Sequence, residues 1–336
     1  MAEKYVTGIK PTGELHIGNY VSVIKPIIDI LNYEKDVEVY FFIADYHALT
    51  VHPNPEELKN NIQNMMLALY SIFSTENWPK ENKLYLYRQS KITSILEYYW
   101  ILECYCAKGL LNRNHSYKQL REENIYKNKD PDKGIFMGIF NYPVLMASDI
   151  LITDADYVPV GQDQKQHIDI CNDISDKLKY IYGRYDIFKR VIPVIKYDNL
   201  LLPGTDGRKM SKNYNNVVSV FAHEKELKNY IYGIKTNSKE EGIPKFPEES
   251  NISTIHKLFS APNEYYNFIE DMRRGKGWKE LKDIVFENIN NKLKPYRETY
   301  EIYKNNLDIN FILNCEKTVK EIANRKLNKI KKLIGT

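Results

Sequence analysis

Short apolar runs in the first two thirds of the chain alternate with longer segments in which apolar residues recur at helical spacing. Four runs predict buried strands, over residues 5–9, 37–44, 84–88 and 157–160. Strands that alternate with helices form parallel sheets, because each helix carries the chain back to the same edge of the sheet. The pattern therefore predicts an α/β fold built on a Rossmann-like parallel sheet.

The segments between these runs have recognisable helix ends. Asn54 precedes Pro55, which is the order of an N-capping side chain and a proline at the first helical position, and this helix is expected to reach about Phe73. Gly109 and Gly183 each follow a helical pattern, so both are predicted to end helices in a left-handed conformation. Other helices are expected from near residue 15 and over 94–107, 136–151 and 164–182.

After residue 220 the pattern becomes mostly helical and rich in lysine, with helices expected over 224–234, 253–259, 279–305 and 316–334. We expect two domains. Residues 1–220 form the Rossmann-like domain, with a helical insertion at about 88–150. Residues 221–336 form a smaller helical domain, whose last helix is able to pack back on the Rossmann-like domain.

The composition, with 43% hydrophobic and 27% charged residues, is that of an ordinary globular protein. A net charge of +4 permits a polyanionic partner without requiring one. The last 21 residues hold seven Lys/Arg and two Glu, which fits a solvated helix face as well as a phosphate-binding surface. The four cysteines lack zinc-type spacing, so no metal site is expected. With no targeting signal and no apolar run long enough for a bilayer, a cytoplasmic protein without membrane contact is expected.

The first chemical motif is GIKPTGELHIGNY, residues 8–20, at a strand-to-helix junction. Ligands of open parallel sheets bind at the carboxyl ends of strands, and a helix N-terminus there offers N–H groups to phosphate. Gly18 would let a nucleotide approach the backbone, and His16 and Asn19, three residues apart, are expected on one helix face as donors to phosphate oxygens. Alone, the motif also fits a structural histidine and two turn glycines, Gly8 and Gly13.

The second motif is GTDGRKMSKN, residues 204–213, in which Gly204 and Gly207 are expected to make a flexible loop that presents two lysines. Lys209 and Lys212 would stabilise the charge that develops on a leaving pyrophosphate if they reach it only in the transition state. A basic surface loop is the alternative interpretation of this segment alone.

Together the two motifs resemble the signatures of the class I aminoacyl-tRNA synthetases. His16-Ile17-Gly18-Asn19 has the form ending in Asn that is typical of the tryptophan enzymes, and residues 209–213 resemble the second signature with Asn213 in the last place. The segments YPVLMASDI, residues 142–150, and VPVGQDQKQH, residues 158–167, resemble the core of the tryptophan enzymes. Lys10 departs from the family, which commonly has Gln there, and we hypothesise that Lys10 acts on phosphate.

Asp149 interrupts an otherwise apolar helix. A buried carboxylate is costly unless it has a partner, and an indole N–H is a donor that needs an acceptor. The resemblance assigns Asp149 this acceptor role, whereas the alternative is an acid that pairs with a nearby lysine. His47 would border the same pocket, and its alternative is a hydrogen-bonded loop histidine.

The resemblance implies the following site. Catalysis would rest on His16, Asn19, Lys209 and Lys212. ATP would be contacted by Lys10, Pro11, Thr12, Gly18, Asn19, Gly161, Gln162, Asp163, Leu200, Lys209, Met210, Ser211, Lys212 and Asn213. Tryptophan would be bound by His47, Tyr142, Met146, Asp149 and Gln164, with Tyr142 and Gln164 on its ammonium group.

The resemblance also implies the reaction and the partners. A tryptophan–tRNA ligase activates tryptophan with ATP and Mg²⁺, carried on the ATP phosphates, and then transfers it to tRNA(Trp). Residues 1–220 would be catalytic, 221–336 would bind the tRNA anticodon region, and the chain would form a homodimer through about 88–150. The apolar residues 95–111 fit that interface or an ordinary core equally well.

Two alternatives share part of this pattern. A tyrosine–tRNA ligase has the same fold and signatures, but the GIKPTG opening and the YPVLMASD run favour the tryptophan enzymes. The other alternative is an RNA-binding relative without catalysis, against which the intact His16, Gly18, Lys209 and Lys212 argue.

Overall fold

The computed structural model describes residues 2–195, 202–204, 208, 210, 214 and 216–336. Within this part of the chain, five parallel strands form a sheet in the order β3-β2-β1-β4-β5. The strands are β1 (Glu3–Ile9), β2 (Val37–Ile43), β3 (Lys83–Arg88), β4 (Tyr157–Pro159) and β5 (Ile192–Val194). The predicted Rossmann-like parallel sheet is confirmed. The apolar runs did not predict β5, which is only three residues long and contains a proline.

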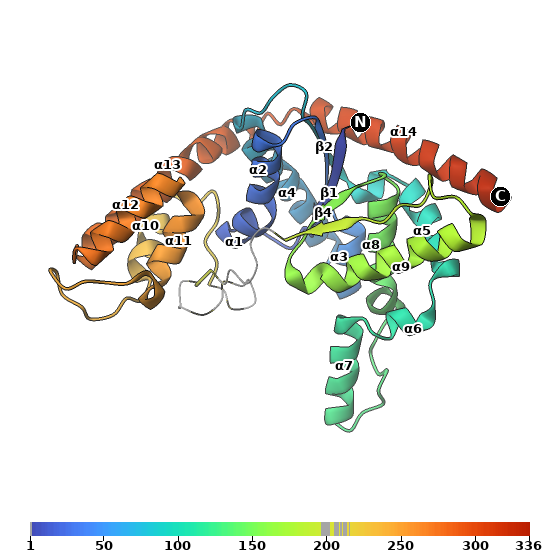
Figure 1. Cartoon of the computed structure of the whole chain (residues 1–336), viewed down its shortest axis with the longest axis horizontal. Coiled ribbons are helices and arrows are strands. Elements are labelled where there is room, and N and C mark those ends of the chain that lie inside the picture. The colour runs from blue at the N-terminus through green and yellow to red at the C-terminus, as the bar shows by residue number, and fades with distance from the viewer. Residues whose placement is uncertain (1, 196–201, 205–207, 209, 211–213, 215) are drawn as a thin grey trace.

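Helices connect the strands and cover both faces of the sheet (Figure 1). In the first half of the chain they are α1 (Ile17–Asn19), the π-helix η1 (Tyr20–Ile24), α2 (Lys25–Tyr33), α3 (Asp45–Ala48), η2 (Leu49–Val51), α4 (Pro55–Thr75), η3 (Gln89–Lys91), α5 (Ser94–Tyr105), α6 (Lys108–Leu111), α7 (His115–Tyr126), α8 (Met137–Leu151), η4 (Gln162–Gln164) and α9 (Lys165–Tyr182). The later helices are α10 (Glu224–Gly233), η6 (Pro247–Glu249), α11 (Asn251–Phe259), α12 (Pro262–Arg273), α13 (Trp278–Tyr303) and α14 (Ile309–Ile334).

Two of the predicted helix ends lie where their capping residues indicated. The Asn54 side chain accepts hydrogen bonds from two backbone N–H groups of the first turn of α4, and Gly183 ends α9 with φ of 63°. The prediction for Gly109 is wrong, because α5 already ends at Tyr105 and Gly109 lies inside α6. Helix α14 begins seven residues before the predicted start, where the Asp308 side chain caps it, and α12 was not predicted.

The sheet separates two cores. In β2, Val39, Phe41 and Ile43 face the core that contains α2, α4 and α13, whereas Tyr40 and Phe42 face the core formed by α5, α8, α9 and α14. Alternate residues of a strand point to opposite faces, so a strand covered on both sides must be apolar along its length. This explains why 39–44 forms an uninterrupted apolar run, which Glu38 precedes near the start of the strand.

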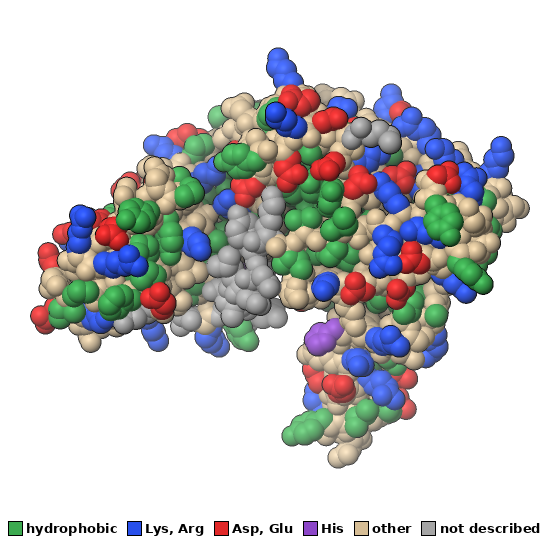
Figure 2. Space-filling view, viewed as in Figure 1, with side chains coloured by type: hydrophobic (Ala, Val, Ile, Leu, Met, Phe, Trp, Pro, Cys, Tyr) green, Lys and Arg blue, Asp and Glu red, His purple; other side chains and the backbone are tan. Residues whose placement is uncertain are grey.

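The two long C-terminal helices connect the helical region to the sheet. Helix α13 packs against α4, and α14 packs against β3 and α5 (Figure 1). Helix α14 buries Val319, Ala323, Leu327 and Ile330. Its exposed lysines and arginine lie on the solvent side, along the upper right edge in Figure 2. None of the helices in the described part of the chain combines the length and apolarity needed to cross a membrane.

Candidate active site

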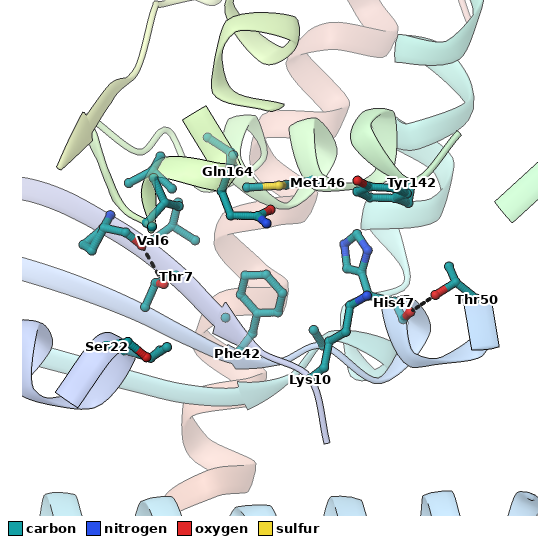
Figure 3. A pocket seen from close by; sticks show the side chains of 18 of the residues that line it. Val6, Thr7, Lys10, Ser22, Phe42, His47, Thr50, Tyr142, Met146 and Gln164 are labelled. Atoms are coloured by element: carbon teal, nitrogen blue, oxygen red, sulfur yellow. Dashed lines mark hydrogen bonds between the residues drawn. The ribbon is translucent and has the colours of Figure 1, made fainter. Parts of the chain in front are cut away.

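A cavity of about 440 Å³ opens at the carboxyl ends of β1, β2 and β4, beneath α8 (Figure 3). Its wall is mostly apolar, with Phe42 from β2 and Met146 and Ile150 from α8. Six residues predicted to bind ligands line it: Lys10, His47, Tyr142, Met146, Gly161 and Gln164. An apolar cavity with a few convergent polar groups at this edge of a parallel sheet is the usual form of a small-molecule site.

Asp149 lies directly behind the cavity wall and is fully buried. Its Oδ2 is 3.0 Å from Nε2 of His47, and the side-chain amide of Gln89 donates to Oδ1 at 2.9 Å and Oδ2 at 2.8 Å. Burial raises the pKa of the Asp149 carboxyl, against the hydrogen bonds from His47 and Gln89 that favour the charged form. The carboxylate therefore pairs with a histidine and an amide, and not with the lysine of the alternative interpretation.

His47 lies in α3, and not in a loop as the alternative interpretation had it. It lines the cavity, and it is hydrogen-bonded to Asp149, so it is a polar wall residue held in place from behind. The Thr50 hydroxyl donates to the His47 carbonyl at 2.8 Å, which closes the short helical turn that carries the ring (Figure 3).

A second polar group lies beside His47, since the ring centres of His47 and Tyr142 are 6.4 Å apart (Figure 3). The Tyr142 hydroxyl is 2.8 Å from Nε2 of His167, and Nδ1 of His167 is 2.9 Å from Oε1 of Gln164. Asn114 and Ser116 also bond to the Tyr142 hydroxyl, at 3.2 and 3.1 Å. Burial lowers the pKa of His167 to about 4, so the ring is neutral near pH 7 and links the two residues predicted to hold the substrate ammonium.

The Lys10 side chain rises from the loop after β1 to the mouth of the cavity (Figure 3). Its Nζ is 5.9 Å from the centre of the Tyr142 ring. Lys10 exposes much of its surface, but partial desolvation of the ammonium lowers its pKa. The group thus brings a positive charge to the cavity mouth, where an anionic substrate group would enter.

The first signature forms a tight reciprocal cap. His16 is the N-cap of α1: its Nδ1 accepts the backbone N–H of Asn19 at 3.2 Å, and the Asn19 side chain accepts the backbone N–H of His16 at 3.4 Å. His16 therefore precedes the helix, which corrects the prediction that it shares a helix face with Asn19. With Nδ1 as the acceptor, the proton of the neutral ring is on Nε2, the nitrogen that can donate to phosphate.

Part of the second signature lies against the first. The segment that follows the second signature also pairs with the first: the Ile17 N–H donates to the carbonyl of Val218 at 2.9 Å, and the Val220 N–H donates to the carbonyl of Leu15 at 3.0 Å. A Cβ on Gly18 would lie 2.9 Å from the His16 ring and 3.5 Å from Sδ of Met210. Gly18 is therefore required by its close approach to the His16 ring within the first signature, while the contact with Met210 is an ordinary van der Waals distance. Leu200, Lys209, Ser211, Lys212 and Asn213 lie outside the described residues.

Glycines near the cavity also serve packing. Gly8 belongs to β1, and a Cβ there would lie 2.5 Å from the Phe42 ring, so the interpretation of Gly8 as a turn residue is wrong. Gly13 has φ of 75° and is a turn glycine. A Cβ on Gly161 would lie 2.7 Å from Oδ1 of Asp163, so Gly161 keeps the chain close to the turn that starts α9.

The remaining predicted residues surround the cavity without lining it. Pro11 and Thr12 follow Lys10 in the loop before α1, and Gln162 and Asp163 form the η4 turn before α9. Sequence reasoning missed Gln89, His167, Asn114 and Ser116. Gln89 did carry a signal, because a polar residue directly after a buried strand lies at the ligand-binding edge of a parallel sheet.

A family model described as tRNA synthetases class I (W and Y) matches residues 2–294. The chain is 38% identical over 302 residues to a tryptophan–tRNA ligase of Pseudomonas aeruginosa, covering 90% of this chain and 66% of that protein. It is 39% identical over 303 residues to a tryptophan–tRNA ligase of Xylella fastidiosa, covering 90% and 68%. The chain thus spans about two thirds of the length of the curated relatives that it matches.

Solved structures match over most or nearly all of the chain. The tryptophanyl-tRNA synthetase of Campylobacter jejuni, complexed with ADP and tryptophan, superposes with a TM-score of 0.79 at 34% identity, covering 99% of this chain and 100% of that one. A tyrosyl-tRNA synthetase of Archaeoglobus fulgidus shares the fold, with a TM-score of 0.62 at 19% identity over 89% of this chain and 90% of that one. The chain belongs to the class I tRNA synthetases of the tryptophan and tyrosine type, within the tryptophanyl-tRNA synthetase family.

Proposed function

We propose that this protein is a tryptophan–tRNA ligase, and that the cavity under α8 holds the tryptophan side chain. The observation that carries the proposal is the fully buried Asp149 carboxylate behind an apolar wall. Its bonds to His47 and Gln89 leave it capacity for a further donor, because a carboxylate has about four acceptor sites. Phenylalanine offers no such donor and would leave a buried carboxylate under-satisfied.

The proposed first step joins tryptophan to AMP. A carboxylate oxygen of tryptophan attacks the α-phosphorus of ATP, the bond to the bridging oxygen breaks, and pyrophosphate leaves. Lys10, His16 and Asn19 would bind phosphate oxygens, with Mg²⁺ arriving on the ATP phosphates. Lys209 and Lys212 would stabilise the leaving pyrophosphate. Catalysis of this kind rests on positioning and on stabilising charge, without a covalent enzyme intermediate.

In the second step, a 3′-terminal ribose hydroxyl of tRNA(Trp) attacks the activated carbonyl and AMP leaves. Helices α10–α13 would bind the anticodon region, and the exposed basic face of α14 would contact phosphates. Such contacts predict binding that weakens steeply with salt. We further propose that the protein acts in the cytoplasm as a homodimer, with exposed apolar residues of α5, such as Leu96 and Trp100, at the interface.

The test is exchange of labelled pyrophosphate into ATP, run with tryptophan, with tyrosine and without amino acid. Exchange that requires tryptophan supports the proposal. Exchange that requires tyrosine identifies a tyrosine–tRNA ligase. A folded protein without exchange under any of the three conditions identifies a relative that has lost activation chemistry.

A further inference from the structure

Gln89 does not line the cavity, yet it bonds to both elements that form the cavity's polar end. It lies on the η3 turn directly after β3, and its side chain is fully buried. Its Oε1 accepts the backbone N–H groups of Tyr46 at 3.1 Å and His47 at 3.4 Å, in α3. Its Nε2 donates to both carboxylate oxygens of Asp149. One side chain therefore joins the end of β3 to α3 and α8.

These contacts fix the orientation of the Gln89 amide. Two backbone N–H groups face its oxygen, so exchanging the oxygen and the nitrogen would set donors against donors at α3. The same exchange would set the amide oxygen against the carboxylate of Asp149. Only one orientation satisfies all of the groups, and in it the amide hydrogens must point at Asp149.

A carboxylate that accepts from a fixed donor is itself fixed. Asp149 is fully buried, so it cannot exchange the Gln89 donor for water. Without that donor, the carboxylate would have His47 as its hydrogen-bond partner among the described residues. It would then turn toward His47 or take up a proton, and either change weakens the acceptor offered to a ligand in the cavity.

We propose that Gln89 is a positioning residue that aims the Asp149 carboxylate at the ring N–H of tryptophan, without touching the substrate. The inference rests on the proposed function and deepens it. It predicts that Gln89 governs discrimination between a ring with an N–H donor and a ring of the same shape without one. It also predicts that Gln89 has no influence on ATP, because its contacts all lie at α3 and α8.

The experiment compares tryptophan with 3-(1-benzothiophen-3-yl)alanine, in which sulfur replaces the ring N–H. Pyrophosphate exchange gives kcat/KM for each amino acid and KM for ATP. The variants are Gln89→Met, which removes both polar ends, and Gln89→Glu. The second keeps the side-chain length and the acceptor toward α3 but sets a second carboxyl group against Asp149, so the two acids share a proton and the acceptor offered to the ring N–H weakens even where Gln89→Met folds poorly. Gln119→Met, on the exposed face of α7, is the matched control.

We expect both Gln89 variants to reduce the preference for tryptophan over the sulfur analogue by roughly 10–100-fold, by analogy with the loss of a hydrogen-bond partner behind a metal ligand. Both Gln89 variants should keep the wild-type KM for ATP. Gln119→Met should keep the wild-type preference for tryptophan over the analogue. Two results would overturn the inference: an unchanged preference in both variants, or an equal loss of kcat/KM for the two amino acids. In either case, tryptophan-dependent exchange by the wild-type protein would still uphold the proposed function. A wild-type protein without that exchange overturns both.

Discussion

Nε2 of His47 lies 3.0 Å from Oδ2 of Asp149, which joins residues 102 positions apart in the chain across one end of the cavity. Both side chains are buried, with exposed fractions of 6% for His47 and none for Asp149. An interaction of this kind is weakened little by salt or solvent, since both groups are shielded from water. The polar end of the cavity is therefore a fixed feature of the free protein.

Asp149→Asn is the most direct test of this feature. The asparagine would turn its own NH₂ group toward His47 or Gln89, both of which donate to the carboxylate. We expect kcat/KM for tryptophan to fall roughly 10²–10³-fold, as when one partner of a buried charged hydrogen bond is removed. Asp173→Asn, exposed on α9, is the control and should behave as wild type. Pyrophosphate exchange measures the effect, and retention of wild-type kcat/KM would remove Asp149 from the site.

The sequence predicted the sheet well because burial on both faces makes strand residues uniformly apolar. It predicted less of the site, because hydrogen bonds between distant segments leave no periodic signal. Asp149 stood out as a charge in an apolar helix, whereas Gln89 and His167 are ordinary polar residues whose importance depends on what the fold places beside them. Gly109 shows the limit for helix ends: a glycine marks conformational freedom, and a short second helix can still include it.

Lys10→Gln tests the cation at the cavity mouth. If the ammonium binds phosphate, we expect KM for ATP to rise roughly tenfold, the scale of one charge-assisted hydrogen bond. Desolvation lowers the pKa of Lys10, so its positive charge is lost at a lower pH than that of an ordinary lysine. Wild-type activity should therefore decline on the alkaline side, and the decline should be absent from Lys10→Gln. Exchange rates measured against pH check both points, and Lys10→Arg should keep the charge at high pH.

Lys10 has no phosphate role if Lys10→Gln leaves both KM values and the turnover unchanged. A rise in KM for tryptophan alone would instead assign the ammonium to the substrate carboxylate.

Gly18→Ala tests the close packing of Gly18 on the His16 ring within the first signature. The added methyl group would lie 2.9 Å from the His16 ring, which must move. Because misplacement of a catalytic group by about 1 Å can cost roughly 10²-fold in rate, we expect kcat to fall between 10- and 100-fold. Gly109→Ala is the matched control in α6, where a new Cβ meets nothing within 4 Å, and it should stabilise the protein by up to about 1 kcal/mol. Equal kcat values for the two variants would refute the packing argument.

Glu316→Gln tests how α14 is held on the sheet. The carboxylate of Glu316 bonds to Nε of Arg88 at 2.6 Å and to its Nη2 at 2.9 Å, at the end of β3. The pair is partly buried, and removing the charged acceptor weakens two charge-assisted hydrogen bonds, so we expect the free energy of unfolding to drop by about 2 kcal/mol. Glu321→Gln, exposed on the same helix, should have no measurable effect. Chemical denaturation measures both, and equal stabilities would mean that packing alone holds α14.

His256 in α11 tests the acid stability of the helical region. It is 2% exposed and packs on Phe268, with ring centres 4.3 Å apart, and neither ring nitrogen has a hydrogen-bond partner among the described residues. Burial lowers the pKa of His256 to about 4, against the weaker opposing effect of Glu264. Between about pH 6.5 and 4 the unfolded chain therefore binds a proton that the folded chain excludes, so stability is lost as the pH falls through this window.

His256→Leu removes both the unsatisfied nitrogens and the proton-binding site. At pH 7 we expect it to be more stable than wild type by about 1 kcal/mol, since a buried polar group without a partner is costly. From pH 6.5 to pH 4 the free energy of unfolding should fall less for His256→Leu than for wild type. The difference between the two losses should be on the order of 2 kcal/mol. Denaturation curves across this range measure the difference, with the exposed His115→Leu as control. Parallel stability curves for wild type and His256→Leu would show that His256 takes up its proton in the folded protein as readily as in the unfolded chain, which would contradict the effect of burial.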